Sequence, residues 1–197
     1  MTLSVDLDDR YFDLREDGFD VGIRVAKDLP DSSLVARKLT STPDILVASP
    51  RYVASHGVPK SPTALCEHQC ITLARQNTKW IFASPNGPID VRIDHATTVS
   101  NDLTLILLAC LGGGIIRSPR LLVDSELRRG RLIQILAEFK FKRDYGIFAI
   151  YPGNSPLASV RVFVELVATW LPKLGELDRW NPLLLPLEGE SGRGERI

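Results

Sequence analysis

The sequence predicts an α/β fold with mainly parallel sheets. Candidate strands alternate with candidate helices through most of the 197 residues, and this alternation is typical of strand–helix–strand units. Apolar residues make up 44% of the chain and charged residues 24%, the balance of a soluble domain with a real core. The length fits one domain or two small lobes.

The N-terminal quarter is expected to hold three strands and one helix. Alternating apolar residues over 3–7 predict a half-buried strand, and a short helix over 11–14 should end at Gly18. Apolar stretches over 21–25 and 45–48 predict two further strands.

Several helical patterns begin with a Ser-Pro pair. A serine side chain caps the free amides of a helix start, and proline is well tolerated at the first helical position. We therefore expect helices to begin at Ser49-Pro50, Ser61-Pro62, Ser118-Pro119 and Ser155-Pro156.

The middle of the chain contains a hairpin signal and a very apolar helix. Asn86-Gly87 separates two strand patterns, and this dipeptide favours a tight hairpin turn. The apolar helix over 103–111 should be capped by Ser100 or Asn101 and ended by the glycines at 112–114. The remaining expected elements are strands over 70–74, 79–83, 89–93, 115–117, 132–136 and 147–151, and helices over 119–129 and 157–171.

Charge and composition argue against several classes of function. The formal net charge is zero, whereas a domain that neutralises phosphates usually has a basic excess, so we expect no direct nucleic-acid contact. No apolar run reaches the ~18 residues that span a bilayer, and the start lacks the pattern of a signal peptide. We therefore expect a cytoplasmic protein without a membrane segment. Three cysteines do not suggest a disulfide framework.

One set of short segments is informative because of its order. The set contains DRYFDL at 9–14, GFDVGIR at 18–24, LPDSSLVARKL at 29–39, LVASPRY at 46–52, WIF at 80–82, SND at 100–102, LGGGI at 111–115 and ELRRGRL at 126–132. Each segment is weak alone. Together, over about residues 3–171, the ordered set resembles the effector-binding domain of LysR-type transcriptional regulators.

The resemblance implies a two-lobed fold like that of type II periplasmic binding proteins. Two strands would cross between the lobes, near 39–45 and near 150–152. Lobe one would then comprise residues 1–40 plus 152–172 and lobe two residues 41–151, followed by a partly disordered tail over 173–197. The family also has a winged helix-turn-helix, a linker helix, and a first strand and helix in lobe one. None of these is found here, so we expect a truncated lobe one.

The implied function is sensing rather than catalysis. A small effector, an organic acid or an aromatic compound, would bind between the lobes and modulate transcription, in a homodimer or with a partner regulator chain. Alternatives are a solute-binding protein of the same fold and a non-functional truncated remnant. We expect no enzyme activity and no cofactor, because no nucleophile, base and oxyanion site is assembled and the glycines at 112–114 follow a helix, unlike phosphate-binding glycines.

Three segments are candidates for effector contact, each with a simpler structural explanation. Ligands of open α/β sheets settle at the carboxyl ends of strands, and free amides at a helix start favour anionic groups. Capping alone is the favoured explanation for the second and third segments, and a bond within lobe one explains the first equally well. The candidates are Arg24, Val25 and Ala26; Ser100, Asn101 and Asp102; and Arg117, Ser118 and Pro119.

A short cysteine–histidine motif is the remaining candidate for chemistry. Cys66, His68 and Cys70 stand close together, but a structural zinc site needs four ligands, usually in paired short spacings. We therefore expect no metal site.

Overall fold

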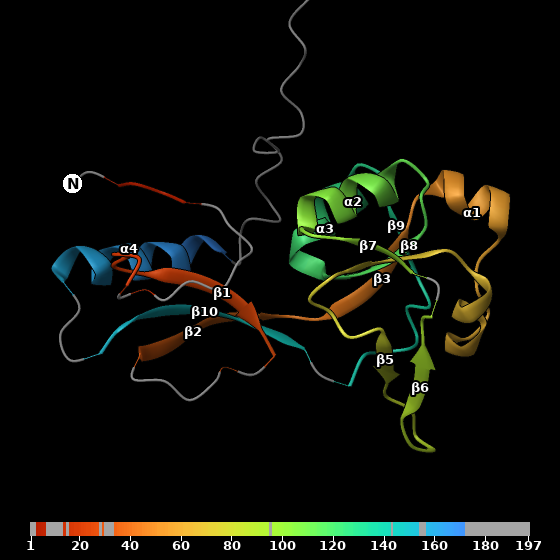
Figure 1. The fold of residues 1–197 in the computed structure, drawn as a ribbon, viewed down its shortest axis with the longest axis horizontal. Helices are drawn as coiled ribbons and strands as arrows, with labels where there is room; N and C mark the ends of the chain where they lie inside the picture. Colours follow the sequence, from red (N-terminus) through yellow and green to blue (C-terminus); the bar gives the residue numbers. More distant parts are fainter. Residues whose placement is uncertain are drawn as a thin grey trace, which may run out of the picture.

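A computed structural model describes residues 3–6, 14, 16–27, 29, 34–94, 96–142, 144–153 and 157–171. The elements form two groups that lie side by side (Figure 1). The smaller group, called the first lobe, contains β1 (Gly22–Ala26), β2 (Leu34–Thr42), β10 (Tyr145–Pro152) and helix α4 (Ala158–Trp170).

The larger group, called the second lobe, contains the other elements. Five of its strands form one sheet, in the order β7-β4-β8-β3-β9, and two form the separate hairpin β5-β6. Its strands are β3 (Asp44–Ala48), β4 (Cys70–Leu73), β5 (Lys79–Phe82), β6 (Ile89–Arg92), β7 (Thr97–Val99), β8 (Ile115–Pro119) and β9 (Ile133–Ile135). Its helices are α1 (Pro50–His56), the 3-10 helix η1 (Pro62–Glu67), α2 (Asp102–Cys110) and α3 (Arg120–Arg128).

The α/β class is confirmed, but the expectation of mainly parallel sheets is wrong for the described residues. Only β4 pairs in parallel, with β7 and β8. The other described pairs are antiparallel, including both pairs of the first-lobe sheet, whose order is β1-β10-β2. The reason is that β2 leads out of the first lobe and β10 leads back, so the two strands run in opposite directions.

Strand β10 belongs to the first-lobe sheet over its whole length. It pairs with β2 from Tyr145 opposite Thr42 to Pro152 opposite Leu34. On the other side, β2 is followed by β3 directly after Pro43.

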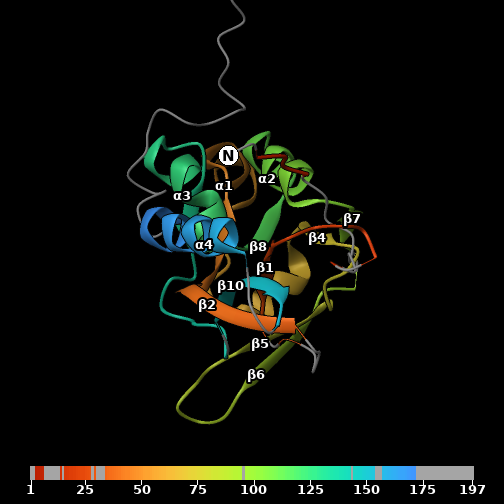
Figure 2. The same ribbon diagram turned by 90° about the vertical axis from the view of Figure 1, so that its left-hand side faces the viewer.

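The second lobe holds most of the described core. Its sheet has an apolar cluster on each face, one around Trp80 and Phe82 and the other between the sheet and helices α2 and α3. In the first lobe, α4 lies across β10 and β2 (Figures 1 and 2) and buries Val160 and Val164 against Ala149. The better packed second lobe is therefore the rigid support for side chains at the junction.

Local sequence signals predicted some element boundaries and missed others. Ser49 caps α1 by accepting from the Tyr52 amide, and β5 and β6 form the expected hairpin around Gly87, whose φ is 106°. Ser61 and Ser118 make no side-chain cap. The other Ser-Pro pair, most of the helix expected over 11–14 and the tail over 173–197 lie outside the described residues.

The strand expected over 3–7 is not formed in its described part. Residues 3–6 have no regular secondary structure, and the side chains of Leu3 and Val5 are exposed. Alternation alone was an insufficient signal, because among the described residues no strand pairs with this segment. Among the described residues, no helix is both long and apolar enough to span a membrane.

Helix α3 is capped by residues of the lobe crossing instead of by Ser118. The Thr42 hydroxyl accepts from the Leu121 amide at 3.1 Å, and the Pro43 carbonyl accepts from the Arg120 amide at 2.8 Å. The end of β2 is thus tied to the second lobe by satisfying the free amides of α3.

Replacing Thr42 with valine should lower the free energy of unfolding by about 1 kcal/mol, the usual cost of losing a helix cap. Valine keeps the shape and strand preference of threonine but cannot accept the Leu121 amide. Thr40→Val is the matched control, because the Thr40 hydroxyl makes only a local 3.5 Å contact with the Ser41 carbonyl. Urea unfolding of the two variants checks this, and equal stabilities would show that the cap contributes nothing.

Candidate functional site

One end of the second-lobe sheet faces the crossing strands. Because β4, β7 and β8 run in parallel, their carboxyl ends lie at the same edge of the sheet. β3 runs antiparallel to β8, with Asp44 opposite Pro119, so the start of β3 lies at that edge too. This is where an open α/β sheet presents binding groups.

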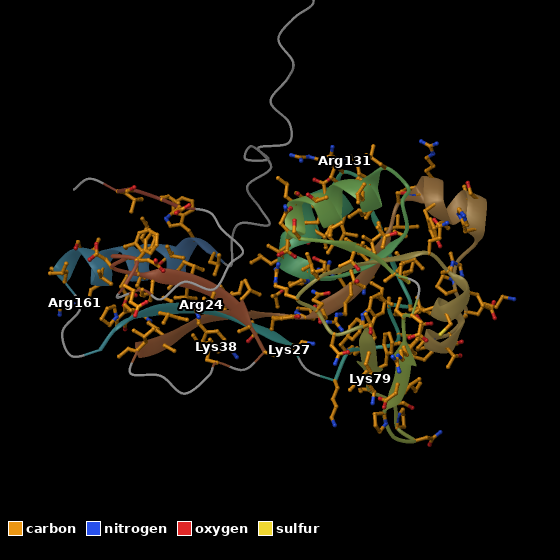
Figure 3. All side chains as sticks on the ribbon, viewed as in Figure 1. Arg24, Lys27, Lys38, Lys79, Arg131 and Arg161 are labelled. Carbon is orange, nitrogen blue, oxygen red and sulfur yellow. The ribbon has the colours of Figure 1, made fainter. Side chains whose placement is uncertain are left out.

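Three charged side chains meet at this edge. Asp44 Oδ2 lies 3.3 Å from Lys27 Nζ and 3.5 Å from Arg117 Nε. The side chain of Asp44 is fully buried and that of Arg117 is 6% exposed, whereas that of Lys27 is 30% exposed. Lys27 directly follows β1, and in Figure 3 it lies at the junction, so it belongs to the first lobe and its two partners to the second.

Aromatic rings surround the two cations. The Arg117 guanidinium lies 5.7 Å from the centre of the Trp80 ring and 5.4 Å from that of Phe141, and Lys27 Nζ lies 4.8 Å from the centre of the Tyr145 ring. Cations over aromatic faces are stabilised by the ring quadrupole. We call Lys27, Asp44, Arg117 and Tyr145 the interlobe cluster.

Burial dominates the electrostatics of the interlobe cluster. It raises the pKa of Asp44, and Arg117 and Lys27 only partly oppose that rise. The pKa of Tyr145 is also raised, first by burial and then by the Asp44 carboxylate. When Lys27, Arg117 and Asp44 are ionised, two cations lie beside one carboxylate, and the charge of Asp144 also acts on Asp44.

The start of helix α2 lies near the cluster but already has protein partners. Asn101 accepts from the Thr104 amide at 2.8 Å, which confirms the expected cap, and its own amide donates to Ser100 at 3.4 Å. Asp102 forms a 2.5 Å ion pair with Arg75, which follows β4, and its charge contributes to the raised pKa of Tyr145. The structure therefore brings Asp102 and Arg117 toward the same tyrosine.

The end of β8 presents its side chains on the two faces of the sheet. Arg117 is on the face of Trp80 and joins the cluster. Ser118 is opposite Ile45 in the register, is buried, and among the described residues bonds the neighbouring Pro119 carbonyl at 3.3 Å. The expected segment 117–119 is therefore part of β8 and does not follow it, and Arg117 is its side chain that lies in the cluster.

The first-lobe candidates lie within β1. Arg24, Val25 and Ala26 pair with residues 146–148 of β10. In Figure 3, Arg24 lies over the sheet of the first lobe, as Lys38 does, whereas Lys27 lies nearer the second lobe. The basic residue that reaches the second lobe is therefore Lys27, three positions later than the residue selected from the sequence.

Sequence reasoning missed Lys27, Asp44 and Tyr145. A signal was present for Asp44, because a carboxylate stands between Pro43 and the fully buried run Ile45–Ala48, and such a carboxylate needs a cation. Lys27 and Tyr145 carried no comparable local signal.

Each side chain of the cysteine–histidine motif has its own hydrogen-bond partner. Cys66 donates to the Arg92 carbonyl and Cys70 to the Leu65 carbonyl, while His68 Nδ1 bonds the Tyr52 hydroxyl at 3.1 Å. Burial raises the pKa of Cys70 to about 12, which keeps the thiol protonated and a poor metal ligand. Within the described part of the chain, no group of three or more side chains is arranged to hold a metal ion.

Known proteins share this fold and belong to the family that the ordered sequence segments resemble. A family model described as LysR substrate binding domain matches residues 1–172. The HTH-type transcriptional regulator CrgA of Neisseria meningitidis serogroup B is 32% identical over 170 residues, which is 84% of this chain and 56% of CrgA. DmlR of Escherichia coli K12, also an HTH-type transcriptional regulator, is 30% identical over 172 residues, 85% of this chain and 55% of DmlR.

Solved structures of LysR-type regulators have a similar fold. The CrgA regulatory domain has a TM-score of 0.75 at 30% identity, covering 83% of this chain and 81% of that domain. Full-length AphB of Vibrio cholerae has a TM-score of 0.70 at 28% identity, covering 85% of this chain and 57% of AphB. These likenesses confirm the two-lobed fold. The chain spans about half the length of the curated relatives that it matches. With the family model matched over residues 1–172, the chain belongs to the LysR substrate binding domain family.

Proposed function

We propose that this chain is the effector-sensing part of a LysR-type transcriptional regulator and that a small anion binds at the interlobe cluster. The observation that carries the proposal is the pair of cations, Lys27 and Arg117, that lie on either side of the junction beside Asp44. Each lobe contributes one of the two cations, so a ligand that contacts both of them would touch both lobes. We take the first lobe to be the residues up to Thr42 together with 145–171, and the second lobe to be the stretch between them.

The chemistry of the cluster favours an organic acid. Lysine and arginine side chains recognise carboxylates by charge-assisted hydrogen bonds, and the Tyr145 ring beside Lys27 offers one aromatic face. The other two rings, Trp80 and Phe141, are buried in the core under Arg117. A carboxylate on a small body therefore fits better than an extended aromatic compound.

Binding would affect transcription by favouring one arrangement of the lobes. A ligand shifts such an equilibrium only by its difference in affinity for the two arrangements. The relatives are named HTH-type transcriptional regulators, which supports a regulatory role in place of a catalytic one. We propose that the signal passes to a helix-turn-helix head, in the same polypeptide or in a partner regulator chain of a dimer, in the cytoplasm.

Replacing Lys27 with methionine should weaken the binding of a small carboxylate about tenfold, the value of one charge-assisted hydrogen bond at a partly buried site. A thermal-shift panel of small carboxylic acids selects the probe, because a ligand of the folded state raises the melting temperature. Calorimetry then measures its dissociation constant, with the neutral amide of the same acid as the chemical control.

Lys38→Met is the matched control variant. Lys38 is an exposed lysine on β2 of the same sheet, and Figure 3 places it away from the junction. Its substitution should leave the dissociation constant unchanged. Equal weakening by both substitutions would indicate a general charge effect, and no weakening by Lys27→Met would refute the site.

A further inference from the structure

We infer that Asp44 is the resident counter-ion of the interlobe cluster and that an anionic effector binds by competing with its carboxylate for Lys27 and Arg117. This inference rests on the proposed function, because it concerns the regulation of the same site. It makes effector affinity depend on the charge of one buried side chain that the ligand need not touch.

The geometry of the ion pairs supports this competition. Charge-assisted N–H···O bonds are usually about 2.7–2.9 Å long, and an exposed pair of this chain, Arg92–Asp94, has such a length at 2.7 Å. The buried contacts of Asp44 are longer, at 3.3 Å and 3.5 Å. Lys27 hydrogen-bonds Asp44, and Arg117 hydrogen-bonds the Tyr145 hydroxyl, but within the described residues Asp44 Oδ1 and Arg117 Nε are buried without a hydrogen-bond partner.

Orphaned polar atoms at a fully buried position are costly. The contacts of Asp44 with Lys27 and Arg117 are longer than short charge-assisted bonds and leave Asp44 Oδ1 and Arg117 Nε unsatisfied. The Nε1 atom of Trp80, the ring under Arg117, is also buried without a partner in the described part of the chain. Arg117 Nε and Trp80 Nε1 are thus buried donors without a partner in the described residues, and an anionic group that reached them would satisfy them.

Lys27 is the cation that can change partner. Its side chain is 30% exposed, and it already rests over the Tyr145 ring at 4.8 Å. Its contact with Asp44 joins the first lobe to the second. An anion that draws Lys27 away from Asp44 therefore replaces a contact between the lobes with a contact to ligand, which links binding to lobe arrangement.

Among the described residues, few titratable groups act on Asp44, and neither His56 nor His68 is one of them. The groups that face it are Lys27 after β1, Arg117 on β8 and Tyr145 at the start of β10, and the charge of exposed Asp144 also acts on it. His56 and His68 lie around Tyr52 on the α1 side of the second lobe. The titration that links pH to the cluster is thus that of Asp44.

The raised pKa of Asp44 sets the direction in which anion affinity changes with pH. Burial raises the pKa of Asp44 above its usual value, so the carboxyl becomes neutral as pH falls through that raised pKa. A neutral Asp44 no longer competes for the cations. Affinity for an anion should therefore rise as pH falls and reach a plateau once Asp44 is protonated.

The test uses sodium benzoate and sodium acetate as probes on the full chain between pH 4.5 and 7.5. At pH 7.5, Asp44→Asn should bind them about tenfold more tightly than the wild type, because one repelling charge a few ångströms away is removed. The variant should also lose most of the pH dependence. Asp90→Asn is the matched control, since it removes an exposed carboxylate that pairs with Lys79, and it should behave like the wild type.

A second measurement needs no variant, which matters if Asp44→Asn does not fold. An anion bound beside Asp44 raises the pKa of that carboxyl, so binding must take up protons. Calorimetry of the wild type at pH 5.5 in two buffers of different ionisation enthalpy measures that uptake. Proton uptake together with tighter binding at low pH supports the competition.

The possible failures are distinguishable. Probe binding without proton uptake, with equal affinity in Asp44→Asn and wild type, overturns the counter-ion role and leaves the effector site standing. No binding of either probe to any variant at any pH overturns both the counter-ion role and the proposed anion site.

Discussion

Replacing Arg117 with methionine should destabilise the chain by about 3 kcal/mol at neutral pH. Breaking a buried ion pair by removing one partner leaves an uncompensated charge, and this is among the most costly single changes. Arg117 lies close to the fully buried Asp44 side chain and is the largest of the influences that keep its pKa from rising further. Methionine fills most of the volume between Trp80 and Phe141 without supplying a charge.

The destabilisation caused by Arg117→Met should become smaller as the pH falls. Without Arg117, the pKa of Asp44 in the folded state rises further above its unfolded value, so the folded state binds more protons than the unfolded state does between those two values. Stability therefore increases as pH falls through this window. Guanidinium unfolding at pH 7.5 and at pH 5 measures both effects.

Arg120→Met is the control for this experiment. Arg120 begins α3, its side chain is half exposed, and it forms a surface ion pair with Asp124 at 3.6 Å. Its loss should change the free energy of unfolding by less than about 1 kcal/mol. A stability of Arg117→Met equal to that of Arg120→Met would contradict a buried, charged Asp44.

Replacing Gly114 with alanine should lower the free energy of unfolding by about 3 kcal/mol. Gly114 has a φ of 153°, and a Cβ added there would lie 2.7 Å from the Gln69 carbonyl oxygen. That neighbour is backbone of the segment leading into β4 and cannot rotate away, so the substitution combines an unfavourable φ with a close contact.

Gly130→Ala separates the two causes. Gly130 also has a positive φ, 68°, but no atom lies within 4 Å of an added Cβ. Gly130→Ala should lower the free energy of unfolding by about 1 kcal/mol, because only the backbone conformation is unfavourable for alanine. Urea unfolding compares the two, and equal costs would show that the approach of Gly114 to Gln69 is looser than described.

The packing around the glycines at 112–114 could not be predicted from the local sequence. The sequence indicates only a helix end followed by backbone freedom. In the structure the turn is closely packed, because the Gly113 amide donates to the Leu108 carbonyl at 2.9 Å and a Cβ at Gly113 would lie 3.0 Å from that oxygen. Adjacent elements, rather than the glycines themselves, fix this turn.

The sequence by itself determined the features that depend on neighbours along the chain. The caps at Ser49 and Asn101 and the hairpin around Gly87 follow from bonds and torsions within a few residues, and each was predictable. The α/β class and the LysR-type resemblance followed from the order of such local features over most of the chain.

Only the tertiary structure decided the site and the cap of α3. Lys27, Asp44 and Tyr145 are far apart in sequence, and they meet because β1, β3 and β10 all end or begin at the junction of the lobes. Thr42 replaced Ser118 as the cap because the crossing strand brings its hydroxyl to the Leu121 amide. Contacts of this kind depend on strand pairing between distant segments, and no local pattern encodes that pairing.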